Sequence, residues 1–164
     1  MTGNVLQVNI SSGGLPKRPV AEGIVTPLGI QGDLHEHPRI HGGPGKALLL
    51  MAMETIEELT ARGYPVFPGA LGENITTQGI DPRQLRSGHQ FRLGTAVIEL
   101  TKLRIPCATL DVYGPAIQRE IFDAQVKAGD TASPRWGMSG FYAKVLADGL
   151  VRPGDPIELM AALA

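Results

Sequence analysis

The chain contains one cysteine, Cys107, in a sequence context that favours reactivity. It follows the segment Leu103–Pro106, in which the proline restricts the chain to an extended entry. We expect a short helix to begin there and to run through Leu110. A thiol at a helix N-terminus beside a positive charge such as that of Arg104 is typical of a reactive cysteine. A lone cysteine is also often a small buried hydrophobe, so the local context leaves both interpretations open.

A second group of chemistry-bearing residues lies in a long polar segment. His35, His37 and His41 occur with two carboxylates between Gly32 and His41. In an extended segment, the His-x-His spacing would point both rings the same way, which suits a zinc or iron site. A solvated loop explains the same residues, so the spacing leaves open whether this segment binds a metal of its own.

Two glycine-rich turns beside basic residues are candidate anion cradles. They span Gly42–Lys46 and Ser11–Arg18. The first is not a nucleotide-binding P-loop, because Ile40 occupies the position of its first glycine and Ala47 replaces the magnesium-binding Ser or Thr. Flexible turns are the alternative interpretation of both segments.

Composition narrows the classes of protein to consider. The 164 residues are 43% hydrophobic and 19% charged, with a net charge of -1, so nucleic acid is a poor default partner. No apolar run approaches the roughly 20 residues of a membrane span, and the start lacks the features of a signal peptide. We therefore expect a cytoplasmic protein without membrane contact. The single cysteine excludes a disulfide within the chain and every zinc motif that needs paired cysteines.

The elements that must position these residues are short strands joined by long loops. With 21 glycines, 13 prolines and 5% aromatic residues, the sequence indicates many turns and few bulky core residues. Alternation, short apolar runs and flanking turn residues predict strands over residues 5–10, 20–26, 47–51, 73–77, 89–93, 95–102, 141–146 and 156–160. Helical spacing predicts helices over residues 53–62 and 115–127. The expected fold is mainly β: a closed or partly closed barrel with two or three short helices, in a single domain over residues 1–164.

Taken together, several segments resemble the MOSC domain family, which is named for the C-terminal part of the molybdenum cofactor sulfurase, and in particular its short stand-alone bacterial members. The segments that carry the resemblance are Val8–Ser11 with Gly14–Lys17; Gly32–Asp33 with His35 and His41–Pro44; Pro68–Thr77; Arg92–Gly94; Thr101–Cys107; and Trp136 with Ser139–Tyr142. Each is weak alone, but their order and gaps are fairly specific, and they cover nearly the whole chain.

The resemblance implies a barrel related to the pyruvate kinase barrel domain, with Cys107 as the key residue. That cysteine would either ligate molybdenum in a molybdenum–molybdopterin cofactor or carry a persulfide. Relatives that use the metal reduce N-hydroxylated bases, amidoximes and hydroxylamines. The resemblance also implies that four residues bind cofactor or substrate, with His35 and His41 lining the pocket as proton sources. These four are Lys46, Asn74, Thr101 and Arg104.

The chemistry of the implied cofactor agrees with the motifs. Molybdopterin brings a phosphate and a dithiolene, so its site needs anion cradles and one protein thiolate, and Lys17, Arg18, Lys46 and Arg104 could meet the phosphate. This assignment makes a separate zinc site at the histidines less favoured.

The resemblance to the MOSC domain family also leads to expectations about cofactors and partner proteins. Family members with a pyridoxal phosphate domain carry it before the MOSC part, so pyridoxal phosphate is not expected here. A reductase of a small-molecule substrate would need an external electron-donor reductase, because the sequence has one cysteine and no nucleotide fingerprint. Two alternatives stay open. One is a sulfur-carrier or cofactor-handling module supplied by a sulfur-donor desulfurase, and the other is a binding barrel with a buried, inert Cys107.

Overall fold

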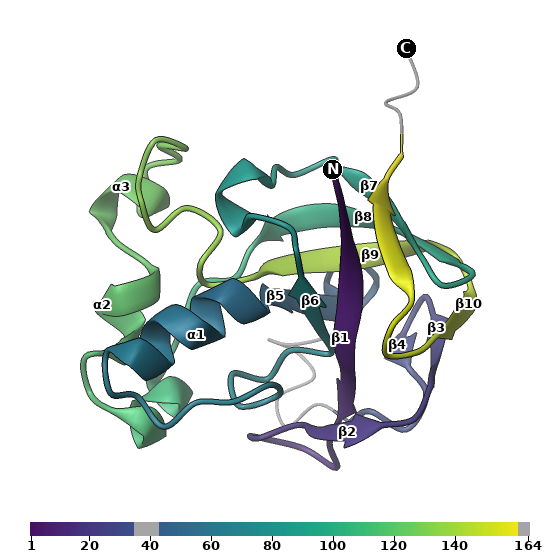
Figure 1. Cartoon of the computed structure of the whole chain (residues 1–164), viewed down its shortest axis with the longest axis horizontal. Helices are drawn as coiled ribbons and strands as arrows, with labels where there is room; N and C mark the ends of the chain where they lie inside the picture. Colours follow the sequence, from purple (N-terminus) through teal and green to yellow (C-terminus); the bar gives the residue numbers. More distant parts are fainter. Residues whose placement is uncertain (35–42, 161–164) are drawn as a thin grey trace.

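A closed β-barrel forms the centre of the chain in a computed structural model that describes residues 1–34 and 43–160 (Figure 1). Seven strands follow one another around it, and the pairing of the last with the first closes the ring. In ring order they are β11 (Pro156–Leu159), β7 (Gln90–Leu93), β8 (Ala96–Leu103), β9 (Phe141–Ala147), β5 (Leu48–Ala52), β6 (Ile75–Gln78) and β1 (Thr2–Ile10). The expected mainly β barrel is confirmed.

Side-chain alternation fills the interior of this barrel. Along β8, Ala96, Ile98 and Leu100 are buried and alternate with partly exposed residues. All five residues of β5 are buried, because one face meets the barrel interior and the other is covered by helices. β7 and β8 form the predicted hairpin, turning at Gly94, whose φ of +55° favours glycine.

Four further strands extend the barrel, and they correct one prediction. β2 (Arg18–Val20) pairs with β1, whereas β3 (Gly23–Thr26), β4 (Gly29–Ile30) and β10 (Gly149–Val151) form a separate small sheet. The expected single strand over residues 20–26 is therefore wrong. Its two halves pair with different partners, and the chain bends between them.

The helices form a layer on one side of the barrel (Figure 1). α1 (Met53–Ala61) joins the parallel strands β5 and β6, as expected for a crossover helix. The predicted helix over residues 115–127 is wrong as a single element, because it divides into α2 (Ile117–Ile121) and α3 (Ala124–Lys127). The division occurs because Asp123 is extended and its carboxylate accepts a hydrogen bond from Val126 N at 2.8 Å, which caps α3.

Three short 3₁₀-helices complete the described elements: η1 (Pro44–Lys46), η2 (Pro82–Gln84) and η3 (Ala108–Tyr113). A second core lies between the helical layer and the outside of the barrel, with Ile56, Leu59, Leu110 and Ile117 fully buried. No helix within the described residues is long and apolar enough to cross a membrane.

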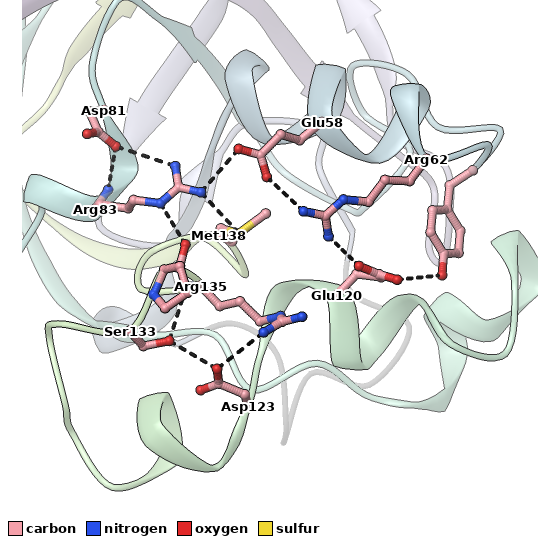
Figure 2. A network of polar contacts seen from close by, with 11 residues as sticks. Glu58, Arg62, Asp81, Arg83, Glu120, Asp123, Ser133, Arg135 and Met138 are labelled. Atoms are coloured by element: carbon pink, nitrogen blue, oxygen red, sulfur yellow. Dashed lines mark hydrogen bonds and ion pairs between the residues drawn. The ribbon is translucent and has the colours of Figure 1, made fainter.

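A series of polar contacts links η2, α1 and α2 (Figure 2). Arg83 Nη2 lies 3.1 Å from Glu58 Oε1 of α1, and Arg62 at the end of α1 pairs with Glu120 of α2. These groups are substantially exposed, so each pair stabilises the fold only modestly.

Candidate functional site

Cys107 lies where the chain leaves the barrel after β8 and begins η3. It is the N-terminal cap residue of that helix, its side chain is exposed, and its Sγ lies 2.9 Å from Thr109 Oγ1, within hydrogen-bonding distance. The expected short helix after Cys107 is confirmed. The alternative of a buried thiol is wrong, because Cys107 is exposed while Pro106 and Leu110 on either side of it are buried.

The side chain of Arg104 points into the protein beneath this segment. Its guanidinium donates to the main-chain oxygens of Ser139 and Leu71, both at 2.8 Å, and contacts Met51 Sδ at 3.2 Å. Its backbone N–H donates to Gly140 O at 2.8 Å. Arg104 therefore holds the base of the Cys107 segment to the turn before β9 and to the helical layer.

Burial shapes the electrostatics of Arg104. The residue is 7% exposed, and loss of hydration lowers the pKa of its guanidinium, while Tyr142, Glu73 and Cys107 act in the opposite direction. Among the described residues no carboxylate lies within ion-pair distance of it. Direct contact between this guanidinium and a bound phosphate would require the side chain to leave these hydrogen bonds.

Thr101 contacts η1, the element that carries Lys46, and Lys46 in turn lies over the ring of Tyr142. Thr101 lies at a register shift between β8 and β9, and its Oγ1 donates to Gly45 O of η1 at 2.7 Å. Lys46 Nζ lies 5.1 Å from the centre of the Tyr142 ring, a cation–π arrangement. The pKa of Lys46 is lowered by partial burial and, next in size, by the charge of Lys102.

Tyr142 connects this group to the thiol. Burial raises the pKa of Tyr142, the charge of Arg104 lowers it, and the charge of Cys107 raises it further. Lys46 covers the ring of this same tyrosine. Of the predicted residues, Lys46 lies over the Tyr142 ring, Arg104 and Cys107 influence the Tyr142 hydroxyl electrostatically, and Thr101 contacts η1, which carries Lys46.

Asn74 lies in a different, buried network. Its Oδ1 accepts from Leu49 N at 3.1 Å, and its Nδ2 donates to Asp33 Oδ2 at 2.8 Å and to Asn9 O at 3.3 Å. The side chain is 2% exposed and links three segments of the chain. These contacts give Asn74 a structural role, and its predicted part in cofactor binding stays a prediction.

In the anion-binding turn expected over Ser11–Arg18, the lysine forms an ion pair with a protein carboxylate. Lys17 Nζ forms an ion pair with Asp33 Oδ1 at 2.6 Å, and the two side chains are 9% and 2% exposed. The expectation that Lys17 meets a phosphate is wrong, because its charge is neutralised inside the fold. The guanidinium of Arg18 lies 5.9 Å from the centre of the Phe67 ring.

The histidine predictions fall outside the described residues. His35, His37 and His41 all lie in residues 35–42, so their roles in catalysis or metal binding stay predictions. Within residues 1–34 and 43–160, no three His, Cys, Asp or Glu side chains form a cluster that could hold a metal ion.

Two residues of this site were not predicted, Lys102 and Tyr142. Both occur in the segments that carry the family resemblance, but only the pairing of β8 with β9 places Lys102 opposite Tyr142. The structure also shows a wholly buried carboxyl, that of Glu73, which no local sequence pattern singles out. Glu73 Oε1 accepts from Gly69 N at 2.6 Å and Thr76 Oγ1 at 3.0 Å, while its Oε2 has no hydrogen-bond partner in the described structure.

The donor set around Tyr142 fits a molybdenum–pterin cofactor in two respects. Cys107 offers an exposed soft sulfur ligand, and Lys46 and Lys102 offer positive charge for a phosphate. Lys17 and Arg104 do not add to this set as they stand, because their donors are engaged with protein groups.

A family model describing the MOSC domain matches residues 37–158. Among curated proteins, the chain is 32% identical over 152 residues to YflK of Bacillus subtilis strain 168, which is described as uncharacterised; the match covers 90% of this chain and 63% of that protein. It is 30% identical over 149 residues to YiiM of Escherichia coli K12, covering 86% and 60%. The chain thus spans about 60% of the length of these curated relatives.

Comparison with solved structures also finds a YiiM protein. YiiM from Geobacillus stearothermophilus superposes with a TM-score of 0.73 at 26% identity, covering 97% of this chain and 75% of that one. The seven-strand ring with few short helices is therefore an architecture found in an experimentally determined relative.

Proposed function

Because this chain belongs to the MOSC domain family, which is associated with the molybdenum cofactor, we propose that it binds this cofactor through Cys107 and reduces N-hydroxylated compounds. The observation that carries the proposal is the exposed thiol of Cys107, which caps the N-terminus of η3 where the chain leaves β8. A soft thiolate and nearby cations are what a sulfur-bound metal and a phosphate each require.

When bound, the molybdenum–pterin group supplies the two-electron chemistry that cleaves a nitrogen–oxygen bond. The overall change consumes two electrons and two protons per N–OH group and yields N–H and water. These 164 residues offer one cysteine and no nucleotide-binding glycine motif, so the electrons must come from outside them, from a reductase protein.

The chain's own residues bind and position in this proposal. Cys107 Sγ is the metal ligand, and the Thr109 hydroxyl at 2.9 Å orients it. Arg104 acts as a positioning residue by fixing the segment to Ser139 O and Leu71 O. Lys46 and Lys102 bind anionic groups, and Thr101 holds η1 in place for Lys46. His35 and His41, predicted from the resemblance, are the proposed proton donors.

An activity assay tests the proposal. The wild type and Cys107→Ala are purified from a host that makes molybdopterin and given an amidoxime, with dithionite-reduced viologen as electron donor. We expect the wild type to form amidine and Cys107→Ala to lose at least about a hundredfold in rate, because a lost metal ligand removes the cofactor's anchor. Val112→Ala, on an exposed position of η3, serves as control for handling losses. Equal activity in wild type and Cys107→Ala would contradict the proposal.

The same exposed thiol also suits a persulfide carrier, the second candidate function. It requires a sulfur-donor desulfurase and no redox turnover. Mass spectrometry after incubation with a desulfurase and cysteine distinguishes the two functions. A +32 Da species on Cys107, in a protein that contains no molybdenum and lacks reductase activity, would favour the carrier.

A further inference from the structure

A turn over residues 69–72 holds the segment that carries the thiol at both of its ends. Leu71 O accepts a hydrogen bond from Arg104 Nη1 at 2.8 Å, on the N-terminal side of the cysteine. Ala70 O, the neighbouring carbonyl of the same turn, accepts from the Tyr113 hydroxyl at 2.7 Å, at the end of η3. Two adjacent carbonyl oxygens of one turn therefore fasten the chain on either side of the exposed sulfur.

The carboxyl of Glu73 fixes this turn from inside the protein. Glu73 is wholly buried, and its Oε1 accepts from Gly69 N at 2.6 Å and from Thr76 Oγ1 at 3.0 Å. Gly69 has a φ of +92°, and a Cβ at this position would collide with Lys17 O, so the turn packs directly on neighbouring backbone. The Lys17 N–H also donates to Gly69 O at 2.9 Å. The turn is thus held by contacts that do not involve η3.

Apolar packing, and not the Tyr113 hydroxyl, buries η3. Leu110, in the middle of that helix, is 1% exposed and packs in the second core. Its N–H donates to Cys107 O at 3.1 Å, which closes the first turn of η3. Burial, and next the charge of Glu73, raise the pKa of Tyr113, so the hydroxyl retains the proton that it donates to Ala70 O. The hydroxyl therefore determines where η3 lies and adds little to its burial.

We propose that Glu73 and Tyr113 are positioning residues for Cys107. Glu73 sets the shape of the turn over residues 69–72, and Tyr113 fixes η3 to that turn. Groups of this kind orient a ligating side chain without touching what it binds. The position of the sulfur is a property of the folded chain, so only its consequence for molybdenum binding rests on the proposed function.

Tyr113→Phe tests the contact at the end of η3, because it removes the hydroxyl and keeps the ring. Two quantities are measured on the folded protein without added cofactor: hydrogen exchange of backbone amides by NMR, and the rate of Cys107 alkylation by iodoacetamide. We expect exchange at Leu110 to be at least about fivefold faster and alkylation at least about threefold faster, because a loosened η3 releases the sulfur from the Thr109 hydroxyl. Amides of β8 should exchange as they do in the wild type.

Tyr64→Phe is the matched control. Tyr64 packs in the same second core, and its hydroxyl donates to Glu120 Oε1 of α2 at 3.3 Å, not to the turn. Removing this hydroxyl should leave Leu110 exchange and Cys107 alkylation unchanged. If Tyr113→Phe behaves as Tyr64→Phe does in both measurements, the proposal is overturned.

Variants of Glu73 test the other half of the proposal. Glu73→Gln keeps an oxygen for the Gly69 and Thr76 hydrogen bonds and should be alkylated within about twofold of the wild-type rate. Glu73→Ala removes that acceptor and should raise the alkylation rate as Tyr113→Phe does. Should Glu73→Ala not fold, Glu73→Asp, whose carboxyl is set back by one carbon, takes its place. A wild-type alkylation rate in the folded variant would overturn the role of Glu73.

Molybdenum content separates this proposal from the proposed function. Prepared from a molybdopterin-producing host, Tyr113→Phe should contain about half as much molybdenum as Tyr64→Phe, or less, because the ligand is less well placed. Equal molybdenum in the two variants would overturn the claim that the position of the sulfur governs metal binding. Absence of molybdenum from the wild type would contradict the proposed function, whereas amide exchange and alkylation still decide whether Glu73 and Tyr113 position the thiol.

Discussion

Arg104 and Ser139 are joined by reciprocal hydrogen bonds between side chain and main chain. Arg104 Nε donates to Ser139 O at 2.8 Å, and Ser139 Oγ donates to Arg104 O at 2.6 Å. Both residues are buried, and Cys107 follows Arg104 by three positions. The turn before β9 therefore holds the base of the segment that presents the thiol.

Ser139→Ala tests this connection. It removes the hydroxyl that donates to Arg104 O, so we expect a loss of about 1–2 kcal/mol in the free energy of unfolding, measured with urea. We also expect a changed rate of Cys107 labelling by a thiol reagent in the folded protein, because the segment loses one of its anchors. Ser12→Ala, at an exposed position, is the control and should change neither quantity. An unaltered labelling rate in Ser139→Ala would show that this turn does not position the thiol.

Breaking the buried ion pair between Lys17 and Asp33 should destabilise the fold strongly. With side-chain exposures of 9% and 2%, removing one charge leaves the other buried without its partner. We expect Lys17→Met to lower the free energy of unfolding by about 3–5 kcal/mol. The double variant Lys17→Met with Asp33→Asn should recover part of that loss, as a double-mutant cycle would measure. If the single and double variants lose equal stability, the pair is not coupled as the structure indicates.

Glu73 predicts a pH dependence of stability. Burial raises the pKa of its carboxyl above the ordinary value of 4.5, so this carboxyl keeps its proton to a higher pH in the folded protein than in the unfolded chain. The favourable contribution is complete below pH 4.5 and is lost as the pH rises through the folded-state pKa. Glu73→Gln stays neutral and keeps an oxygen for the Gly69 and Thr76 hydrogen bonds.

The comparison is made by urea unfolding of both proteins at several pH values from 4 to 8. We expect the stability of Glu73→Gln relative to the wild type to increase with pH. A difference that is constant, or that falls with rising pH, would show that Glu73 is ionised in the folded state.

Thr101→Val tests how η1 is held. The variant lacks the hydroxyl that donates to Gly45 O at 2.7 Å, a contact near the surface, so stability should fall by less than about 1 kcal/mol. Binding of inorganic phosphate, followed by NMR, should weaken severalfold because η1, which carries the proposed anion-binding Lys46, is no longer fastened to β8. Thr101→Ser keeps the hydroxyl and should behave as the wild type does; equal weakening in both variants would contradict the assignment.

Local sequence patterns predicted the elements whose signals are local. The hairpin turning at Gly94 and the buried strand before α1 are where alternation and hydrophobicity placed them. The strand over residues 20–26 and the helix over residues 115–127 were predicted as continuous. Each is divided by a feature that periodicity does not report, namely a change of pairing partner in the first and capping by Asp123 in the second.

The site was predictable where residue type alone carries the chemistry. Cys107 carries the only thiol in the sequence, so it could be identified without knowing its neighbours. The positions of Lys102 and Tyr142 depend on strand pairing across 40 residues, and the burial of Arg104 depends on acceptors at Leu71 and Ser139. A basic residue that the sequence suggests is a surface group can thus stabilise the fold instead. Its hydrogen-bond partners come from distant segments, as those of Arg104 do.

The most direct test of the account is the molybdenum content of the purified protein. The wild type, Cys107→Ala and Val112→Ala are prepared in parallel from a molybdopterin-producing host, and metal per chain is measured by mass spectrometry. We predict close to one molybdenum per chain in the wild type and in Val112→Ala, and none in Cys107→Ala. Molybdenum bound equally by Cys107→Ala and the wild type would contradict the central claim that Cys107 is the metal ligand.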